Sequence, residues 1–163
     1  MTMQFAQLDQ ITELQPDKRV VAVRLLRADE LYLKDHFPHF PVMPGVLMLE
    51  AMYQASAWLV RKSEDFAHGM VVLKEARNVK YKDFVQPGQQ LEVTAEIIKQ
   101  DERLTTLKAE GKVGDSVAVS ARLILERFDL AEENPIRAPH DARLRKRFRE
   151  EFEELLPTSV ETA

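Results

Sequence analysis

A histidine and a carboxylate, separated by a proline-rich loop, are the residues of this sequence best suited to acid/base chemistry. His36 begins a segment that reads HFPHFPVMPGVLMLE and ends at Glu50. An imidazole held by such a stiff loop can take a proton near neutral pH. Glu50 is the only charged residue in the apolar stretch of residues 46–60. An isolated carboxylate there is unfavourable unless it has a partner or a chemical role, so we expect the two residues to act as a catalytic pair.

Three further residues extend this candidate site. Gln54 lies one helical turn beyond Glu50 and can orient its carboxyl group. Burial of Glu50 would raise its pKa and keep a proton available for a leaving group. Gly45 and Val46 begin a predicted helix, whose first N–H groups lack partners and can hold a developing oxyanion. Simpler interpretations also remain: a structural histidine, a glutamate at a helix end or paired with a lysine, and a turn glycine.

Other catalytic classes find less support in the sequence. His36 and His39 flank Pro38, so they cannot share a helical face, and no HExxH or comparable spacing accompanies them. Ser56 lies in no nucleophile-elbow pattern. We therefore expect no metal site and no cofactor.

Composition limits the function classes further. The chain has 163 residues, a formal net charge of -4 and no cysteine. The length fits one domain, and the charge argues against a nucleic-acid binder. The absence of cysteine favours a reducing compartment such as the cytoplasm. No signal peptide is evident in residues 1–10, and residues 46–60 are too short to span a membrane.

The order of apolar residues predicts an α+β fold. Residues 46–62 are apolar on every side, which is typical of a helix buried in a core. Alternating and β-branched residues predict an antiparallel meander around that helix, with Gly111 and Gly114 suited to a hairpin turn. The predicted strands are a first strand at 19–26, one or two at 70–82, and then 91–99, 104–113 and 116–128.

The C-terminal tail has a different character. Residues 132–139 are polar and contain two prolines, which predicts a linker, and residues 141–156 predict an amphipathic helix. We expect its apolar stripe to dock on the rest of the chain or on a neighbouring subunit; the stripe consists of Leu144, Phe148, Phe152 and Leu155. The chain therefore divides into residues 1–130 and a linker with a helical extension at 131–163.

Two blocks of the sequence resemble a known family. Residues 36–54, HFPHFPVMPGVLMLEAMYQ, and residues 75–93, EARNVKYKDFVQPGQQLEV, resemble the signatures of the β-hydroxyacyl-acyl carrier protein dehydratases of bacterial type II fatty acid synthesis. The likeness spans roughly residues 8–128. It implies a hotdog fold, in which a sheet wraps around one central helix. It also implies a homodimer or a trimer of dimers, with His36 of one subunit facing Glu50 of the other.

The resemblance also implies a reaction. His36 would remove the C2 proton of a (3R)-3-hydroxyacyl thioester, and Glu50 would protonate the departing hydroxyl group. The N–H of Gly45 would hold the thioester carbonyl, and Gln54 would support Glu50. The products would be water and a trans-2-enoyl thioester. The partner would be an acidic acyl carrier protein, which a basic rim could recognise; the candidates are Arg61, Lys62, Arg77, Lys80 and Lys82.

Two details refine this interpretation. Glu50 stands where the branch of the family that also isomerises the double bond has aspartate, so the chain resembles the dehydratase-only branch. Asp35 stands where the family usually has glycine. The alternatives are a hotdog thioesterase, a coenzyme A-dependent enoyl-CoA hydratase, and a non-catalytic acyl-binding module.

Overall fold

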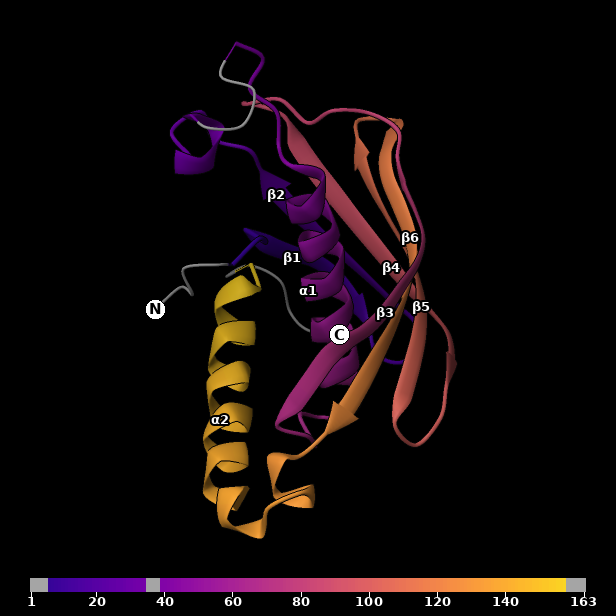
Figure 1. Ribbon diagram of the computed structural model, residues 1–163, viewed down its shortest axis with the longest axis vertical. Coiled ribbons are helices and arrows are strands. Elements are labelled where there is room, and N and C mark those ends of the chain that lie inside the picture. Colours follow the sequence, from indigo (N-terminus) through magenta and orange to yellow (C-terminus); the bar gives the residue numbers. More distant parts are fainter. Residues whose placement is uncertain (1–5, 35–38, 158–163) are drawn as a thin grey trace.

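A curled antiparallel sheet around a central helix forms the body of the protein (Figure 1). The computed structural model describes residues 6–34 and 39–157. Within these ranges the sheet has six strands in the order β1-β2-β4-β5-β6-β3. Their bounds are β1 Gln10–Gln15, β2 Arg19–Leu25, β3 Met70–Tyr81, β4 Gln90–Gln100, β5 Leu104–Val113 and β6 Ser116–Phe128. The α+β hotdog architecture predicted from the sequence is confirmed.

The meander of β4, β5 and β6 is the part of the sheet that the sequence predicts best. These strands pair in succession, and β3 adds to the outer side of β6. Gly114 lies in the β5–β6 turn with a φ of 60°, a conformation that glycine adopts easily. Gly111, in contrast, is part of β5, where an added Cβ would lie 2.9 Å from side-chain atoms of Leu91 and Val119. The prediction that Gly111 belongs to the turn is wrong, because close side-chain packing and not a turn requires it.

The sequence pattern does not predict strand β1 (Gln10–Gln15). Residues 19–26 were expected to be the first strand, but β1 precedes them and pairs with β2 at the edge of the sheet. The sequence of β1, QITELQ, is mostly polar, and a register shift between Ile11 and Glu13 interrupts its alternation. The two-residue period that identifies a half-buried strand is therefore absent.

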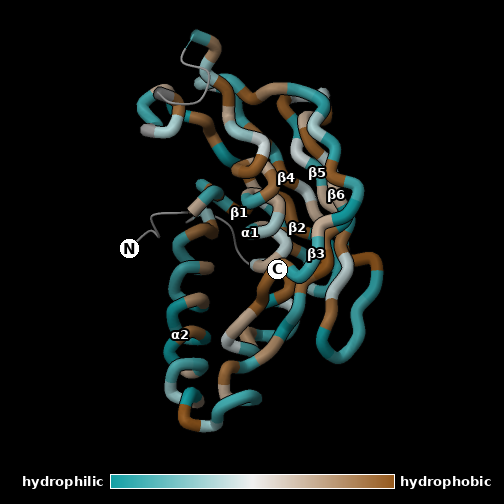
Figure 2. Tube along the Cα trace, viewed as in Figure 1, coloured by the Kyte–Doolittle hydropathy of each residue, from teal (hydrophilic) through white to brown (hydrophobic). Residues whose placement is uncertain are grey.

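The central helix α1, Gly45–Ser63, fills the concave side of the sheet. Ala51, Ala55 and Leu59 follow one another at helical spacing and are fully buried against the strands. Apolar residues accordingly gather between α1 and the sheet (Figure 2). No helix within the described ranges has the length and apolar character needed to cross a membrane.

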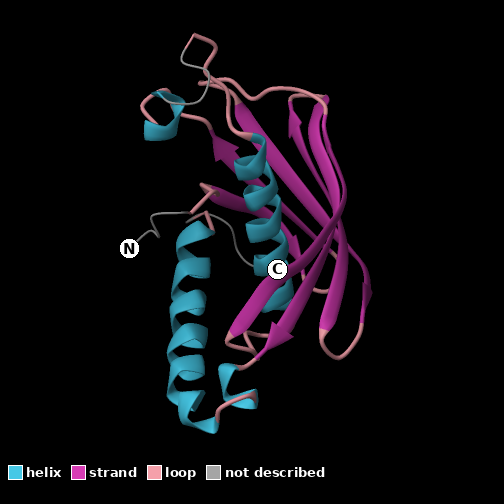
Figure 3. Ribbon diagram, in the orientation of Figure 1, coloured by secondary structure: helices cyan, strands magenta, loops and turns pink. Residues whose placement is uncertain are grey.

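A second long helix, α2 (Ala138–Leu155), lies alongside α1 on the side away from the sheet (Figure 3). Two short 3-10 helices, η2 (Leu130–Glu132) and η3 (Pro135–Arg137), precede it where the sequence predicted only a linker. The buried carboxylate of Asp141 accepts hydrogen bonds from the backbone N–H groups of Leu130 and Ala131. This contact fixes the start of α2 against the end of the sheet.

Aromatic packing joins α2 to α1. The ring of Trp58 lies 5.9 Å from that of Phe148 and 6.0 Å from that of Phe152, measured between centroids. Phe152 also contacts Phe66 and keeps only 2% of its surface exposed. The expected docking of the amphipathic tail on the body of the protein is therefore confirmed for Phe148, Phe152 and Leu155.

Candidate active site

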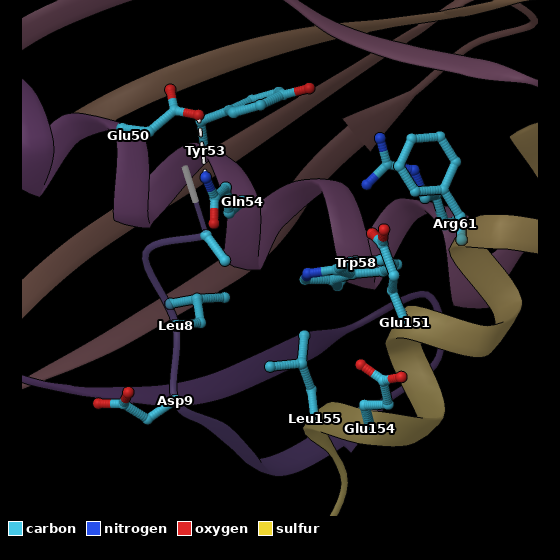
Figure 4. Close-up of a pocket in the computed structure, with 12 residues that line it drawn as sticks. Leu8, Asp9, Glu50, Tyr53, Gln54, Trp58, Arg61, Glu151, Glu154 and Leu155 are labelled. Atoms are coloured by element: carbon cyan, nitrogen blue, oxygen red, sulfur yellow. Dashed lines mark hydrogen bonds between the residues drawn. The ribbon is translucent and has the colours of Figure 1, made fainter. Parts of the chain in front are cut away.

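Glu50 lies in the second turn of α1 and is half-buried. The side-chain amide of Gln54, one turn further along the same face, donates a hydrogen bond of 3.0 Å to Glu50 Oε1 (Figure 4). The sequence predicted this contact from the spacing of the two residues. The apolar neighbours of Glu50 in sequence predicted that it would be buried. It is only half-buried because its side of α1 faces a cavity and not the sheet.

The orientation of the Gln54 amide is set by the N-terminal segment. The backbone N–H of Gln7 donates a hydrogen bond of 2.8 Å to Gln54 Oε1. A backbone N–H can only donate, so the oxygen of the Gln54 amide must face Gln7 and its NH₂ group must face Glu50. The hydrogen bond from Gln7 thereby fixes the Gln54 amide as the donor and Glu50 Oε1 as the acceptor.

A buried arginine in turn holds Gln7 in place. Arg24 on β2 donates through Nε and Nη2 to Gln7 Oε1, at 3.3 and 3.2 Å. The same guanidinium pairs with the carboxylate of Glu30 at 2.5 and 3.1 Å, which also accepts a hydrogen bond from the hydroxyl of Tyr32. Hydrogen bonds thus link Glu50 to Gln54, Gln54 to Gln7, and Gln7 to Arg24. Arg24 in turn binds Glu30, which lies a few residues before the segment 35–38.

The charges of this network are stabilised by their surroundings. Burial disfavours ionisation of Glu30, but the hydrogen bonds from Arg24, Tyr32 and the backbone N–H of Arg27 outweigh it and lower the pKa of Glu30. Burial and the neighbouring Glu30 carboxylate raise the pKa of Tyr32, which keeps its hydroxyl protonated as a donor. Arg24 and Glu30 therefore form a buried ion pair that also holds the hydroxyl of Tyr32.

His36 lies outside the described residues, and so does Asp35. The pairing of His36 with Glu50 remains a prediction from the sequence, as does any effect of Asp35 on the histidine. The described chain resumes at His39, which is exposed. The following loop is fixed by a hydrogen bond of 2.8 Å from the backbone N–H of Met43 to the carbonyl of Val85.

Gly45 and Val46 border an open cavity of about 340 Å³ at the N-terminus of α1. Among the described residues, no side chain caps the first turn of this helix, so the positive end of its dipole is open to a ligand there. A Cβ at Gly45 would lie 2.9 Å from Cε1 of Tyr81. Val46 exposes 69% of its surface. The substrate-binding role of the two residues remains a prediction from the sequence.

A cavity of about 340 Å³ lies next to Glu50 and was not predicted from the sequence. It extends from Glu50 and Gln54 along α1 to Trp58 and Arg61, and α2 closes its far side (Figure 4). The α1 residues recur at spacings of three and four, so the sequence could have placed them on one face. The wall formed by α2 could not be inferred, because it depends on how the tail docks.

Arg61 is buried and not part of a basic rim, which corrects the sequence-based assignment. It exposes 7% of its surface, and its guanidinium lies 3.9 Å from the ring centroid of Phe148 and 5.0 Å from that of Trp58. Burial lowers the pKa of Arg61. An arginine in the last turn of an apolar helix resembles a surface residue in sequence, and only the docking of α2 covers it.

The remaining candidates for a basic rim lie nearer the surface. Lys80 and Lys82 are exposed beside the end of β3, and Lys62 is half-buried. Arg77 is exposed and pairs with Glu75 at 2.7 Å. Among the described residues, no three His, Asp or Glu side chains gather as a metal site would require.

Comparison with known sequences identifies relatives over most of the chain. The family model described as a FabA-like domain matches residues 1–122. A 3-hydroxyacyl-[acyl-carrier-protein] dehydratase FabZ of Lactiplantibacillus plantarum is 34% identical over 116 residues, which cover 71% of this chain and 79% of that protein. The enzyme of the same name from Symbiobacterium thermophilum is 34% identical over 133 residues, covering 82% of this chain and 94% of that protein.

Comparison with solved structures supports the fold. The dehydratase heterocomplex ApeI:P from Xenorhabdus doucetiae contains a chain that matches with a TM-score of 0.66 and 21% sequence identity. The match covers 85% of this chain and 93% of that one. At this identity the likeness concerns the fold alone, and it agrees with the hotdog arrangement of sheet and helix.

Proposed function

The chain belongs to the FabA-like domain family, and we infer that it is a 3-hydroxyacyl-[acyl-carrier-protein] dehydratase, a hydro-lyase of fatty acid synthesis. The observation that carries the proposal is the pair of Glu50 and Gln54, with the Gln54 amide held so that it donates to the Glu50 carboxyl group. It lies within the part of the chain that matches dehydratases of this name.

We assign the proton transfers to His36 and Glu50. His36 takes the C2 proton of the 3-hydroxyacyl thioester, and the electrons of that C–H bond form the C2–C3 double bond. The C3–O bond breaks as Glu50 donates its proton to the departing hydroxyl, which leaves as water. The proton on the imidazole then returns to Glu50 through solvent, which restores both groups.

Gly45 and Val46 hold the thioester in this proposal. Negative charge develops on the thioester oxygen as the C2 proton leaves. The uncapped first turn of α1 offers backbone N–H groups to that oxygen. The cavity beside Gly45 and the small size of glycine support a close approach of the carbonyl group.

We propose that the enzyme works as a homodimer or a trimer of dimers in which His36 of one protomer serves Glu50 of the other. Large apolar side chains near the N-terminus of α1 support an interface there, because each exposes between 47% and 69% of its surface. They are Phe40, Val46, Tyr81 and Phe84.

Acyl carrier protein delivers the substrate in this account. Lys80 and Lys82 are exposed at the end of β3, near the cavity at Gly45, and supply positive charge for an acidic partner. We further propose that residues 1–130 form the catalytic domain and residues 131–163 an extension. A composition free of cysteine supports work in the cytoplasm.

The proposed reaction can be tested with purified protein and 3-hydroxyacyl-acyl carrier protein. We expect formation of the enoyl thioester, followed by its ultraviolet absorbance, without release of the carrier thiol. Release of the thiol with no enoyl product would indicate a thioesterase instead. Failure to transform any 3-hydroxyacyl substrate would contradict the proposal.

A further inference from the structure

We propose that the cavity between α1 and α2 receives the acyl chain of the substrate, and that α2 thereby limits the size of that chain. The inference rests on the proposed function, because it takes the occupant to be the group attached to the reacting carbon atoms. It goes beyond that function because it assigns to α2 the selection of acyl chains by size.

The cavity begins at the residues proposed to act on the reacting carbon atoms. Glu50 and Gln54 line one end of the cavity, and the side chains of Tyr53 and Trp58 continue its wall along α1 (Figure 4). A substrate whose 3-hydroxyl meets Glu50 can extend the remainder of its chain along this wall. The aromatic side chains offer the apolar surface that an acyl chain prefers.

The opposite wall of the cavity comes from α2. Phe148 and Leu155 of α2 line the cavity, although the family model matches only residues 1–122. The helix is held rigidly, since Phe152 is buried and Arg149 donates to the carbonyl of Asp65 at 2.7 Å. A rigid wall can discriminate between chains by size, whereas a mobile one would adapt.

The charges around the cavity specify the chemistry of the occupant. Three carboxylates line the cavity in addition to Glu50, those of Asp9, Glu151 and Glu154. The cation Arg61 stacks on the ring of Phe148. These carboxylates outnumber Arg61, so an acyl chain that ends in a carboxylate would meet an excess of negative charge there. The cavity therefore favours an uncharged chain.

Changes at Leu155 in both directions test the role of α2. Leu155→Ala enlarges the cavity and should raise the ratio of kcat/KM for a long 3-hydroxyacyl chain over a short one by about tenfold. Leu155→Phe fills the cavity and should lower that ratio by a similar factor. The matched control is Lys146→Ala, an exposed position on the same helix, which should leave the ratio unchanged. Thermal melting shows whether each variant remains folded.

Trp58 offers a readout that does not require turnover. It is the only tryptophan of the chain and lines the cavity. A non-reactive acyl-pantetheine thioether with a long chain should therefore change its fluorescence on binding. The same compound with a terminal carboxylate should bind about tenfold more weakly or not at all.

The outcomes separate this inference from the proposed function. The role of the cavity would be overturned by two results together. Both folded Leu155 variants would dehydrate normally with an unchanged ratio of kcat/KM for long over short chains, and the fluorescence of Trp58 would not respond to the thioether. Absence of dehydration by the unaltered protein would overturn the proposed function. In that case the fluorescence titration alone decides whether the cavity binds acyl chains.

Discussion

The backbone N–H of Gln7 and the side-chain oxygen of Gln54 are joined by a hydrogen bond of 2.8 Å, although 47 positions separate the two residues in sequence. This bond determines which end of the amide faces Glu50. Arg24 holds Gln7 from the other side, so strand β2 and the N-terminal segment together orient the carboxyl group. The geometry of the candidate proton donor therefore depends on residues outside the helix that carries it.

Removal of the Gln54 amide should slow the reaction without weakening substrate binding. Gln54→Leu keeps the size of the side chain but loses the hydrogen bond to Glu50. Glu50 becomes charged as it gives up its proton, and a hydrogen bond to a charged group contributes about 1.5–3 kcal/mol. The loss therefore falls on the transition state, and kcat should drop about tenfold to a hundredfold while KM changes little. The matched control is Gln90→Leu at an exposed position of β4. Steady-state kinetics that show a change in KM alone would contradict the positioning role of Gln54.

Gly45→Ala should impair catalysis more than stability. The added Cβ would meet the ring of Tyr81 at 2.9 Å, but that ring is half exposed and can move. We expect a stability loss below about 1 kcal/mol and a fall in kcat/KM of about tenfold or more, because the methyl group obstructs the thioester carbonyl. The double variant Gly45→Ala/Tyr81→Ala separates the two causes. If the double variant is as active as Tyr81→Ala, Gly45 is needed for packing against Tyr81 and not for binding the substrate.

Stability at acidic pH should depend on Glu30. Its pKa is lower in the folded protein than the usual value of 4.5, so its ionised form stabilises the fold above that pH. The contribution is lost as the pH falls below 4.5 and through the lower folded pKa. Glu30→Gln should therefore destabilise the protein by about 1–3 kcal/mol near pH 7, and the difference should shrink in acid. Urea unfolding at several pH values measures it, with the exposed Glu92→Gln as control. A difference that grows in acid would contradict the assignment.

The docking of α2 should contribute strongly to stability. Phe152 is buried between Trp58 and Phe66, so Phe152→Ala should cost about 3–5 kcal/mol in urea unfolding. The control Ile136→Ala changes an apolar residue of the same tail that exposes 83% of its surface, and its effect should stay within about 0.5 kcal/mol. Equal effects of the two substitutions would show that α2 is not packed as described.

The central helix and the meander could be predicted because their patterns are local. The apolar run that contains Glu50 identifies a buried helix, and the alternation along β4, β5 and β6 identifies strands. Strand β1 escaped prediction because its polar sequence and its irregular register leave no period to detect. The pair of Glu50 and Gln54 was predictable in the same way, since both residues lie on one helix face.

The contacts that join distant segments could not be predicted. Nothing in the spacing of residues places Gln7 against Gln54, or Arg61 beneath Phe148, because these contacts arise from how the elements pack. Arg61 illustrates the difficulty, since a charged residue near a helix end is normally exposed. Its burial follows from the docking of α2, which also forms the wall of the cavity beside Glu50.

The most direct test of the account is the rate at which Glu50→Gln converts a 3-hydroxyacyl-acyl carrier protein to the enoyl product. Glutamine has nearly the same shape as glutamate but cannot donate an acidic proton to the departing hydroxyl group. If Glu50 is the proton donor, the rate should fall by about 10²–10⁴-fold while the fold and the thermal stability are retained. Turnover near that of the unaltered protein would show that another group protonates the hydroxyl, and the proposed roles of Glu50 and Gln54 would be wrong.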